Sequence, residues 1–176
     1  GYRSDWLREA AKRGLPNAAT TLEALEAYTR KENIAVFEKA GVFSSREMES
    51  RYEIAREEYS AKVLIEANCA VDMVKTMILP AVRQEYREAI SAYNETDASN
   101  VKCAIDLLHD EVVRLAEGMT AVRDCVVRLE DAVRNSEPEA AIIWMASLRK
   151  EVDALERIVA DDKWPLPKYR EMLFVY

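Results

Sequence analysis

The sequence offers few side chains that could carry out chemistry. It contains one histidine, His109, and it has no glycine-rich phosphate loop, no Gly-x-Ser-x-Gly nucleophile motif and no paired metal-ligand motif. Helical bundles can hold two metals through two Glu-x-x-His motifs, but His109 has only Asp106 three residues before it, and no second motif matches it. We therefore expect no catalytic residue, no cofactor-binding residue and no metal ligand in this chain. His109 is expected to be a partly exposed helix residue.

Glu66 is the carboxylate whose surroundings are least polar. It lies between Val63, Ala67 and Ala70 on an apolar stripe. A buried carboxylate needs a partner, so we expect a structural ion pair with an arginine or lysine of an opposing helix. The alternative is a functional contact, such as one to a neighbouring subunit.

The cysteines indicate neither a disulfide framework nor a zinc site. Cys69, Cys103 and Cys125 form an odd set without Cys-x-x-Cys spacing, which favours free thiols and a cytoplasmic location. The chain opens with Gly1 and Tyr2, without an initiator Met or a signal peptide. That opening is expected of a segment of a longer polypeptide.

The charge balance argues against two classes of partner. The net charge is -7, with 32 acidic and 25 basic residues, and the basic residues are scattered among acidic ones. Nucleic acid is an unsuitable partner because its binding draws on a concentrated positive patch. An anionic membrane surface is unsuitable for the same reason, and the longest apolar run, 140–146, is far shorter than the roughly 20 residues that span a bilayer.

Composition and periodicity predict an all-α fold. Apolar residues make up 49% of the chain, with only four glycines and five prolines in 176 residues, which favours a few long helices. Residues 1–43 read as short helices, one ending near Arg13 and another running from Thr21 to Ala40 with a possible break near Arg30. These short helices are expected to link to an upstream domain.

Residues 44–161 are predicted to form a long antiparallel three-helix bundle or coiled coil. A capping box at Ser44 and Glu47 begins the first helix, in which Pro80 is expected to cause a kink. Two later helices, joined by a turn with a serine cap at Ser136, carry apolar residues in alternating steps of four and three. The predicted line of the second helix is Val101, Ile105, Leu108, Val112, Leu115, Met119, Val122, Val126, Leu129 and Val133, and that of the third is Ala141, Met145, Leu148, Val152, Leu155 and Val159.

Five apolar residues lie beside these lines, namely Val113, Val127, Ile142, Ile143 and Trp144. The simpler interpretation is that the remaining long helix covers them, and the alternative is a contact with another subunit. Residues 162–176 contain two prolines and are predicted to form a strap with a short terminal helix. Trp164, Leu166, Leu173 and Phe174 are expected to pack against the bundle or a neighbouring domain.

The sequence also resembles a known family. The resemblance rests on the stretches Gly1-Tyr2, Gly14-Leu15-Pro16-Asn17, Phe37-Glu38-Lys39, Gly41-Val42-Phe43, Ser50-Arg51-Tyr52-Glu53-Ile54, Ile65-Glu66-Ala67, Ile78-Leu79-Pro80-Ala81, and the ending Trp164-Pro165-Leu166-Pro167 with Tyr169 and Leu173-Phe174. In order and spacing they are similar to the C-terminal region of type III glutamine synthetases.

The resemblance implies an enzyme that ligates ammonia to glutamate with ATP and Mg or Mn, assembled from two stacked hexameric rings. It also implies that the metal, nucleotide and glutamate ligands belong to an upstream catalytic domain, and none of them maps onto this sequence. The expected partners are that domain, other subunits of a homo-oligomer and a regulatory protein. A free-standing helical scaffold without enzymatic activity is the alternative, and an independent bundle enzyme is a third hypothesis that the few polar candidates disfavour.

Overall fold

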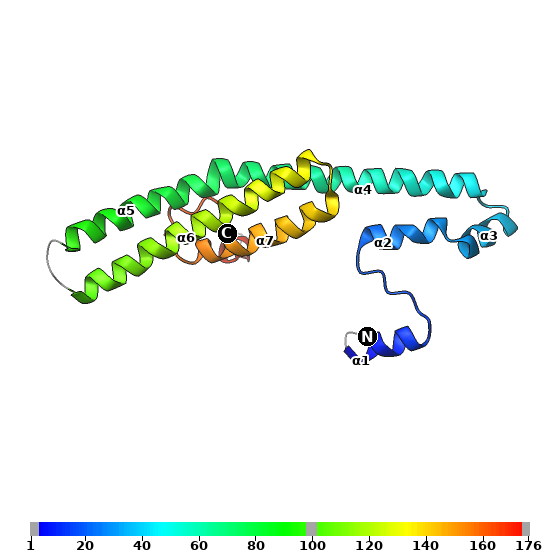
Figure 1. Cartoon of the computed structure of the whole chain (residues 1–176), viewed down its shortest axis with the longest axis horizontal. Helices are drawn as coiled ribbons and strands as arrows, with labels where there is room; N and C mark the ends of the chain where they lie inside the picture. Colours follow the sequence, from blue (N-terminus) through cyan, green and yellow to red (C-terminus); the bar gives the residue numbers. More distant parts are fainter. Residues whose placement is uncertain (1–3, 98–101, 174–176) are drawn as a thin grey trace. The chain divides into compact units, whose positions relative to one another are not determined.

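The structure is a computed structural model that describes residues 4–97 and 102–173 (Figure 1). The described residues form helices and no strand, which confirms the all-α prediction. The chain divides into two units, Gly1–Lys62 and Val63–Tyr176. Among the described residues, none of the helices combines the length and apolar character needed to cross a membrane.

The first unit consists of short helices followed by the start of a long one. Its elements are α1 (Ser4–Lys12), α2 (Thr21–Leu25), the 3-10 helix η1 (Glu26–Thr29), α3 (Lys31–Lys39) and the first part of α4 (Ser45–Met73). The break expected near Arg30 is present, because this residue is extended and separates η1 from α3. Gly14 and Gly41 follow α1 and α3 with φ of 70° and 65°, the left-handed conformation that glycine adopts without strain.

The predicted capping box at the start of α4 is present. The Ser44 backbone N–H donates to Glu47 Oε2 at 2.8 Å, and the Glu47 N–H donates to Ser44 Oγ at 3.3 Å. The hydrogen bonds that the Glu47 carboxylate accepts from the Ser44 backbone N–H and from the Ser44 hydroxyl, with the nearby Arg51 charge, hold the Glu47 pKa below its ordinary value. Two backbone donors that the helix cannot satisfy internally are thereby paired.

Pro80 does not end the long helix. A π-helical turn, η2 (Val74–Ile78), precedes it, and α5 (Leu79–Asp97) continues the helix. The Leu79 N–H donates to the Val74 carbonyl, five residues back, so the turn is one residue wider than an α-helical one. The wider turn accommodates the proline ring and its missing N–H, and Figure 1 shows the helix bending here.

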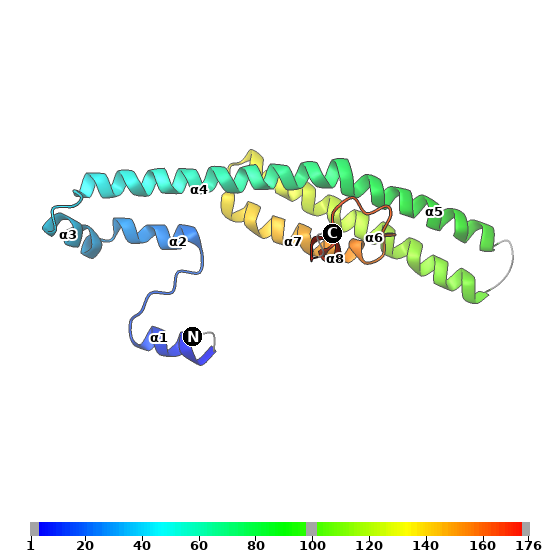
Figure 2. The same ribbon diagram turned by 180° about the vertical axis from the view of Figure 1, so that it is seen from behind.

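Helix α6 (Lys102–Arg134) is the central element of the second unit. It packs along α5 on one side and along α7 (Pro138–Glu156) on another, and the helices alternate in direction (Figure 2). The predicted apolar lines are buried or half-buried throughout, with Leu115, Leu129 and Leu155 almost fully enclosed; Val101 lies outside the described residues. Each enclosed leucine contributes about 1.5–3 kcal/mol to stability.

A second buried line on α6 was not predicted from the sequence. Cys125 and Ala132 are buried beside the seven-residue pattern, and Gly118 lies on the same side of the helix. A Cβ atom added at Gly118 would lie 2.5 Å from Leu155 Cδ2. The absence of a side chain at Gly118 therefore allows α7 to approach α6 closely.

The apolar residues beside the lines are not all covered by a third helix, contrary to the simpler interpretation. Val127 and Ile143 are 50% and 63% exposed, Ile142 is exposed at 37%, and Val113 and Trp144 are half-buried. Val127 is one residue beyond the buried Val126, a rotation of about 100°, which turns it away from the α5 contact. The alternative of a subunit contact stays open.

The strap after α7 belongs to the second unit and packs within it through a few apolar residues. Val159 and Trp164 are buried and Leu166 is half-buried, whereas Leu173, at the end of α8 (Tyr169–Leu173), is exposed. The expected packing of Leu173 is therefore wrong within this chain, because α8 presents it to solvent. Phe174 lies outside the described residues.

The turn between α6 and α7 differs from the predicted serine cap. Ser136 has φ of 57°, and its N–H donates to the Val133 carbonyl while the Glu137 N–H donates to that of Ala132. These bonds close the end of α6 as glycine does at α1 and α3. The N-cap residue of α7 is Glu137, whose side chain makes no capping hydrogen bond. Ser136 is thus used for its backbone conformation, not for its hydroxyl.

We expect Ser136→Gly to raise the free energy of unfolding by about 0.5–1 kcal/mol. A left-handed conformation costs a non-glycine residue about 1–2 kcal/mol, and the greater entropy of glycine in the unfolded chain offsets part of the gain. Urea unfolding measures the effect. The control is Ser91→Gly, in the exposed face of α5, which should be destabilising; a loss of stability with Ser136→Gly would contradict the prediction.

We expect Gly118→Ala to destabilise the protein by about 1 kcal/mol, although alanine is the better helix former, because the new methyl group overlaps the enclosed Leu155 side chain. In a Leu155→Ala background, the same change should become stabilising by up to about 1 kcal/mol. The double-mutant cycle, measured by urea unfolding, tests this reversal of sign. Equal effects in both backgrounds would show that the close approach does not limit the packing.

Candidate functional site

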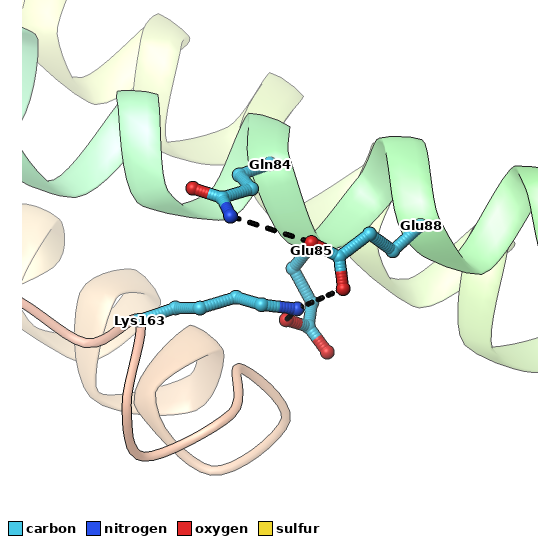
Figure 3. Close-up of polar contacts among 4 residues, drawn as sticks. All are labelled: Gln84, Glu85, Glu88 and Lys163. Carbon is cyan, nitrogen blue, oxygen red and sulfur yellow. Dashed lines mark hydrogen bonds and ion pairs between the residues drawn. The ribbon is translucent and has the colours of Figure 1, made fainter.

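A half-buried lysine, Lys163, fixes the strap to α5. Lys163 Nζ donates to Glu85 Oε2 at 2.7 Å and also to Glu88, and Gln84 Nε2 donates to the other Glu88 oxygen at 3.3 Å (Figure 3). The side chains of Lys163 and Glu85 are only 15% and 13% exposed, whereas Glu88 is 57% exposed. Glu85 and Glu88 lie three residues apart on α5, so one lysine reaches both carboxylates.

The charges in this cluster stabilise one another. Hydrogen bonds to Glu85 and Glu88 raise the pKa of Lys163, and those from Lys163 and Gln84 lower the pKa of Glu88. Catalytic lysines that act as bases or nucleophiles need the opposite shift, towards a neutral amine. The cluster is therefore suited to holding the strap in place and unsuited to nucleophilic chemistry.

The pH range of this tether follows from the two pKa directions. The contribution of Lys163 is complete below its ordinary pKa of 10.5 and is lost as the pH rises through the raised value. The contribution of Glu88 is complete above its ordinary pKa of 4.5 and is lost as the pH falls through the lowered value. The tether is thus complete across the neutral range.

The strap also has a charged attachment nearer α8. Lys168 pairs with Asp161, and both line an open groove of about 480 Å³ together with charged residues of α7. Trp164 lies between these two lysines in the sequence. Its buried side chain supplies the apolar part of the contact. The strap is therefore held by three ion pairs, made by two lysines, and by one indole ring.

The two side chains singled out in the sequence are not part of this cluster. His109 is exposed, as predicted, with its ring centroid 5.8 Å from that of Tyr93 and its Nδ1 4.0 Å from an Asp110 carboxylate oxygen. Glu66 is exposed on α4, so the prediction of a buried carboxylate in a structural ion pair is wrong. The apolar stripe passes through Val63 and Ala67, and Glu66 lies beside it, facing solvent.

The cysteines are free in the structure, as predicted. Cys69 and Cys103 are exposed, and Cys125 is buried between α6 and its neighbours, where burial, with nearby Glu151 and Asp124, raises its thiol pKa. A raised pKa lowers the thiolate fraction and hence reactivity. Within 4–97 and 102–173, the structure brings together no group of three or more histidine, cysteine or carboxylate side chains suited to a metal ion.

Two further grooves lie beside α6. One, of about 310 Å³, lies between α6 and α7 and contains Arg114, Glu117 and Glu151. The other, of about 340 Å³, lies between α5 and α6 and contains Arg83 and Arg123. Sequence reasoning identified neither groove and missed the Lys163 cluster, although Glu85 and Glu88 share a helix face in the sequence.

Comparisons with known proteins identify the family of the chain. Residues 1–97 match the family described as the glutamine synthetase C-terminal domain. The chain is 32% identical to the type-3 glutamine synthetase of Dictyostelium discoideum, 32% to a glutamine synthetase of Bacteroides fragilis (strain YCH46) and 29% to one of Butyrivibrio fibrisolvens. Each alignment covers 99% of this chain and 26%, 26% and 27%, respectively, of those proteins.

These matches define the class of the chain as a C-terminal domain of a larger protein. The chain belongs to the glutamine synthetase C-terminal domain family. It spans about a quarter of the length of the curated relatives that it matches.

We expect Lys163→Met to release the strap, because the Glu85 carboxylate would then be left largely buried without its cation. In a protein with Trp6→Phe and Trp144→Phe, the remaining Trp164 fluorescence should shift to longer wavelength, and the urea midpoint should fall. Lys150→Met, at an exposed lysine of α7, is the matched control. The same emission and midpoint in both variants would contradict the role given to Lys163.

On acidification, the Trp164 fluorescence of the parent protein should change below about pH 4.5, because Glu88 then becomes protonated. The variant Glu88→Gln should show a smaller change.

Proposed function

We propose that this chain is the noncatalytic C-terminal part of a type III glutamine synthetase. The parent enzyme would join ammonia to glutamate with ATP and Mg or Mn, in the cytoplasm, and its catalytic and ligand-binding residues would lie outside this chain. One observation carries the proposal: the chain aligns over 99% of its length with a type-3 glutamine synthetase, of which it matches about a quarter, and its first 97 residues match the family of that enzyme's C-terminal domains.

Residues 1–43 are proposed to link this part to the catalytic domain and to pack against it. The first unit has little core of its own, since Ala10 and Met48 are its buried apolar residues among those described. Large apolar side chains are exposed along it, namely Trp6, Leu7, Leu15, Tyr28, Val36, Val42 and Ile54. So much exposed apolar surface is typical of a segment that packs on another domain.

Residues 44–161 are proposed to act as a coiled-coil-like three-helix bundle that supports assembly of a homo-oligomer, with 162–176 as its closing strap. The exposed Val127 and Ile143 support this role, because apolar side chains left open beside a well-packed core favour a contact with another subunit. Support of the catalytic barrel and docking of a regulator are the other roles that such a surface allows.

The second candidate function is a free-standing scaffold that binds a partner helix. The specific observation that favours it is the groove between α5 and α6, which is lined by apolar side chains and two arginines. A scaffold of this kind would retain its binding without a catalytic domain. The two functions are compatible if the parent enzyme binds a regulator through this groove.

We expect removal of residues 44–176 from the full-length enzyme to reduce its assembly to smaller species, measured by light scattering. Retaining residues 1–43 keeps their proposed contact with the barrel, so the variant isolates the effect of the long helices. Removal of all 176 residues is the comparison. An unchanged mass and activity in both truncated enzymes would exclude the assembly role.

A further inference from the structure

The groove between α5 and α6 has an apolar floor and two cationic walls. Leu79 and Tyr86 of α5 and Ala116 and Met119 of α6 form the floor, and all four are buried or half-buried. The walls carry Arg83 and Arg123, whose side chains are exposed. The groove lies on the side of α6 away from Gly118, where α7 packs.

The residue spacing along the groove matches a helical ligand. Leu79, Arg83 and Tyr86 are separated by steps of four and three, so they form one row about 10 Å long on α5. Helix α6 runs antiparallel and supplies the second row. A helix of two or three turns laid between two such rows buries its own apolar side chains at positions i, i+3, i+4 and i+7.

The arginines lie on opposite walls, at about the same level along the groove. Lys75 of η2 pairs with Glu130 of α6, which sets the register between the two segments. In this antiparallel register, residues whose numbers add up to about 205 lie at the same level, so Arg123 lies near the level of Arg83. A ligand helix with carboxylates on both sides of its apolar row can therefore reach both guanidinium groups.

The sign of the charge distinguishes this groove from the other two. Its lining residues include no carboxylate, within a chain whose net charge is -7. The α6–α7 groove holds Glu117 and Glu151 beside Arg114, and the groove at the strap holds Asp153, Glu156 and Asp161 among its basic residues. A groove lined by two arginines and by no carboxylate favours an acidic ligand.

The one ion pair at this groove does not block it. Arg123 Nη2 contacts Asp124 Oδ1 at 3.0 Å, but the two side chains are 69% and 58% exposed and belong to adjacent residues. Such an exposed pair contributes little to stability. A ligand carboxylate can replace it and bind the guanidinium group through two parallel hydrogen bonds.

We propose that the α5–α6 groove binds an acidic amphipathic helix of a partner protein, with its apolar row on Leu79, Tyr86 and Met119 and its carboxylates on Arg83 and Arg123. This inference rests on the second candidate function, which it deepens by naming the partner, and it is independent of the activity of the parent enzyme. It names the class of partner that the exposed arginines select.

The test uses the 176-residue chain and a fluorescein-labelled peptide of about 18 residues, long enough to form a helix. The peptide carries leucines at i, i+3, i+4 and i+7 with glutamates on both sides, and a matched peptide carries lysines instead. Fluorescence anisotropy should show that the acidic peptide binds at least about tenfold more tightly, and that salt weakens its binding. Absence of binding, or equal binding of the two peptides, would overturn the proposal.

Three variants locate the binding. Arg83→Glu and Arg123→Glu should each weaken binding of the acidic peptide by about tenfold. Arg87→Glu makes the same charge change on α5 at an exposed residue that does not line the groove, and it should change the affinity by less than about twofold. Circular dichroism verifies that all three variants fold. An equal loss of affinity in Arg87→Glu would show that the overall charge, and not the groove, binds the peptide.

Two further outcomes distinguish other occupants. If sodium citrate displaces the peptide at concentrations where sodium chloride of equal ionic strength does not, the groove is a site for small anions and the helix proposal is wrong. If light scattering shows a dimer of the chain that Arg83→Glu dissociates, the occupant is a second copy, and the proposal of a separate partner is overturned. The proposal is supported if citrate does not displace the peptide, if the chain does not form such a dimer, and if the groove variants weaken peptide binding.

Discussion

The second unit depends on one constraint: α6 must pack against two long helices along two different faces. One face carries the buried seven-residue pattern, and the other carries the small residues Gly118, Cys125 and Ala132, of which Gly118 allows Leu155 of α7 to approach. Because the residues of the second face are small, the two helices can lie close together without displacing the larger side chains of the first face. The grooves between α5 and α6 and between α6 and α7 lie along these two contacts.

The strap joins the end of α7 to α5. Both α5 and α7 pack mainly on α6, so a further segment is needed to tie the end of α7 to α5. Trp164 contributes apolar burial, and Lys163 contributes charge-assisted hydrogen bonds to Glu85 and Glu88. A lysine can be largely buried here because two carboxylates meet its charge, which offsets part of the cost of removing it from water. The strap is thus fixed by residues far from it in the sequence.

Periodicity predicted the helices well, because burial of a helix face is a repeating property that a single sequence displays. The all-α fold, the break near Arg30, the capping box at Ser44 and the apolar lines of α6 and α7 are examples. Errors arose where a side chain lay close to the edge of a stripe, since a rotation of one residue decides between core and solvent. Glu66 and Val127 are both such cases, and both are exposed in the structure.

Contacts between distant segments and unusual backbone conformations were beyond sequence reasoning. Ser136 is a residue type that is common at helix starts. It adopts a left-handed conformation at a helix end, because α6 continues to Arg134. Lys163 contacts residues 75 and 78 positions earlier in the chain, and no local pattern indicates that pairing. The expectation that this chain holds no catalytic, cofactor or metal residue stays a prediction. It rests on the family resemblance and on the sparse polar motifs of the sequence.

The π turn at Val74–Ile78 has a consequence for how this protein can vary in length. A helix that is held along both its halves cannot gain or lose a residue without rotating one half by about 100° and moving its buried face into solvent. A turn that already contains one residue more than an α-helical turn can absorb such a change locally. Single-residue insertions and deletions among related chains should therefore collect in this turn. The rows of buried residues on either side, from Val63 to Val71 and from Val82 to Ala89, would then keep their phase.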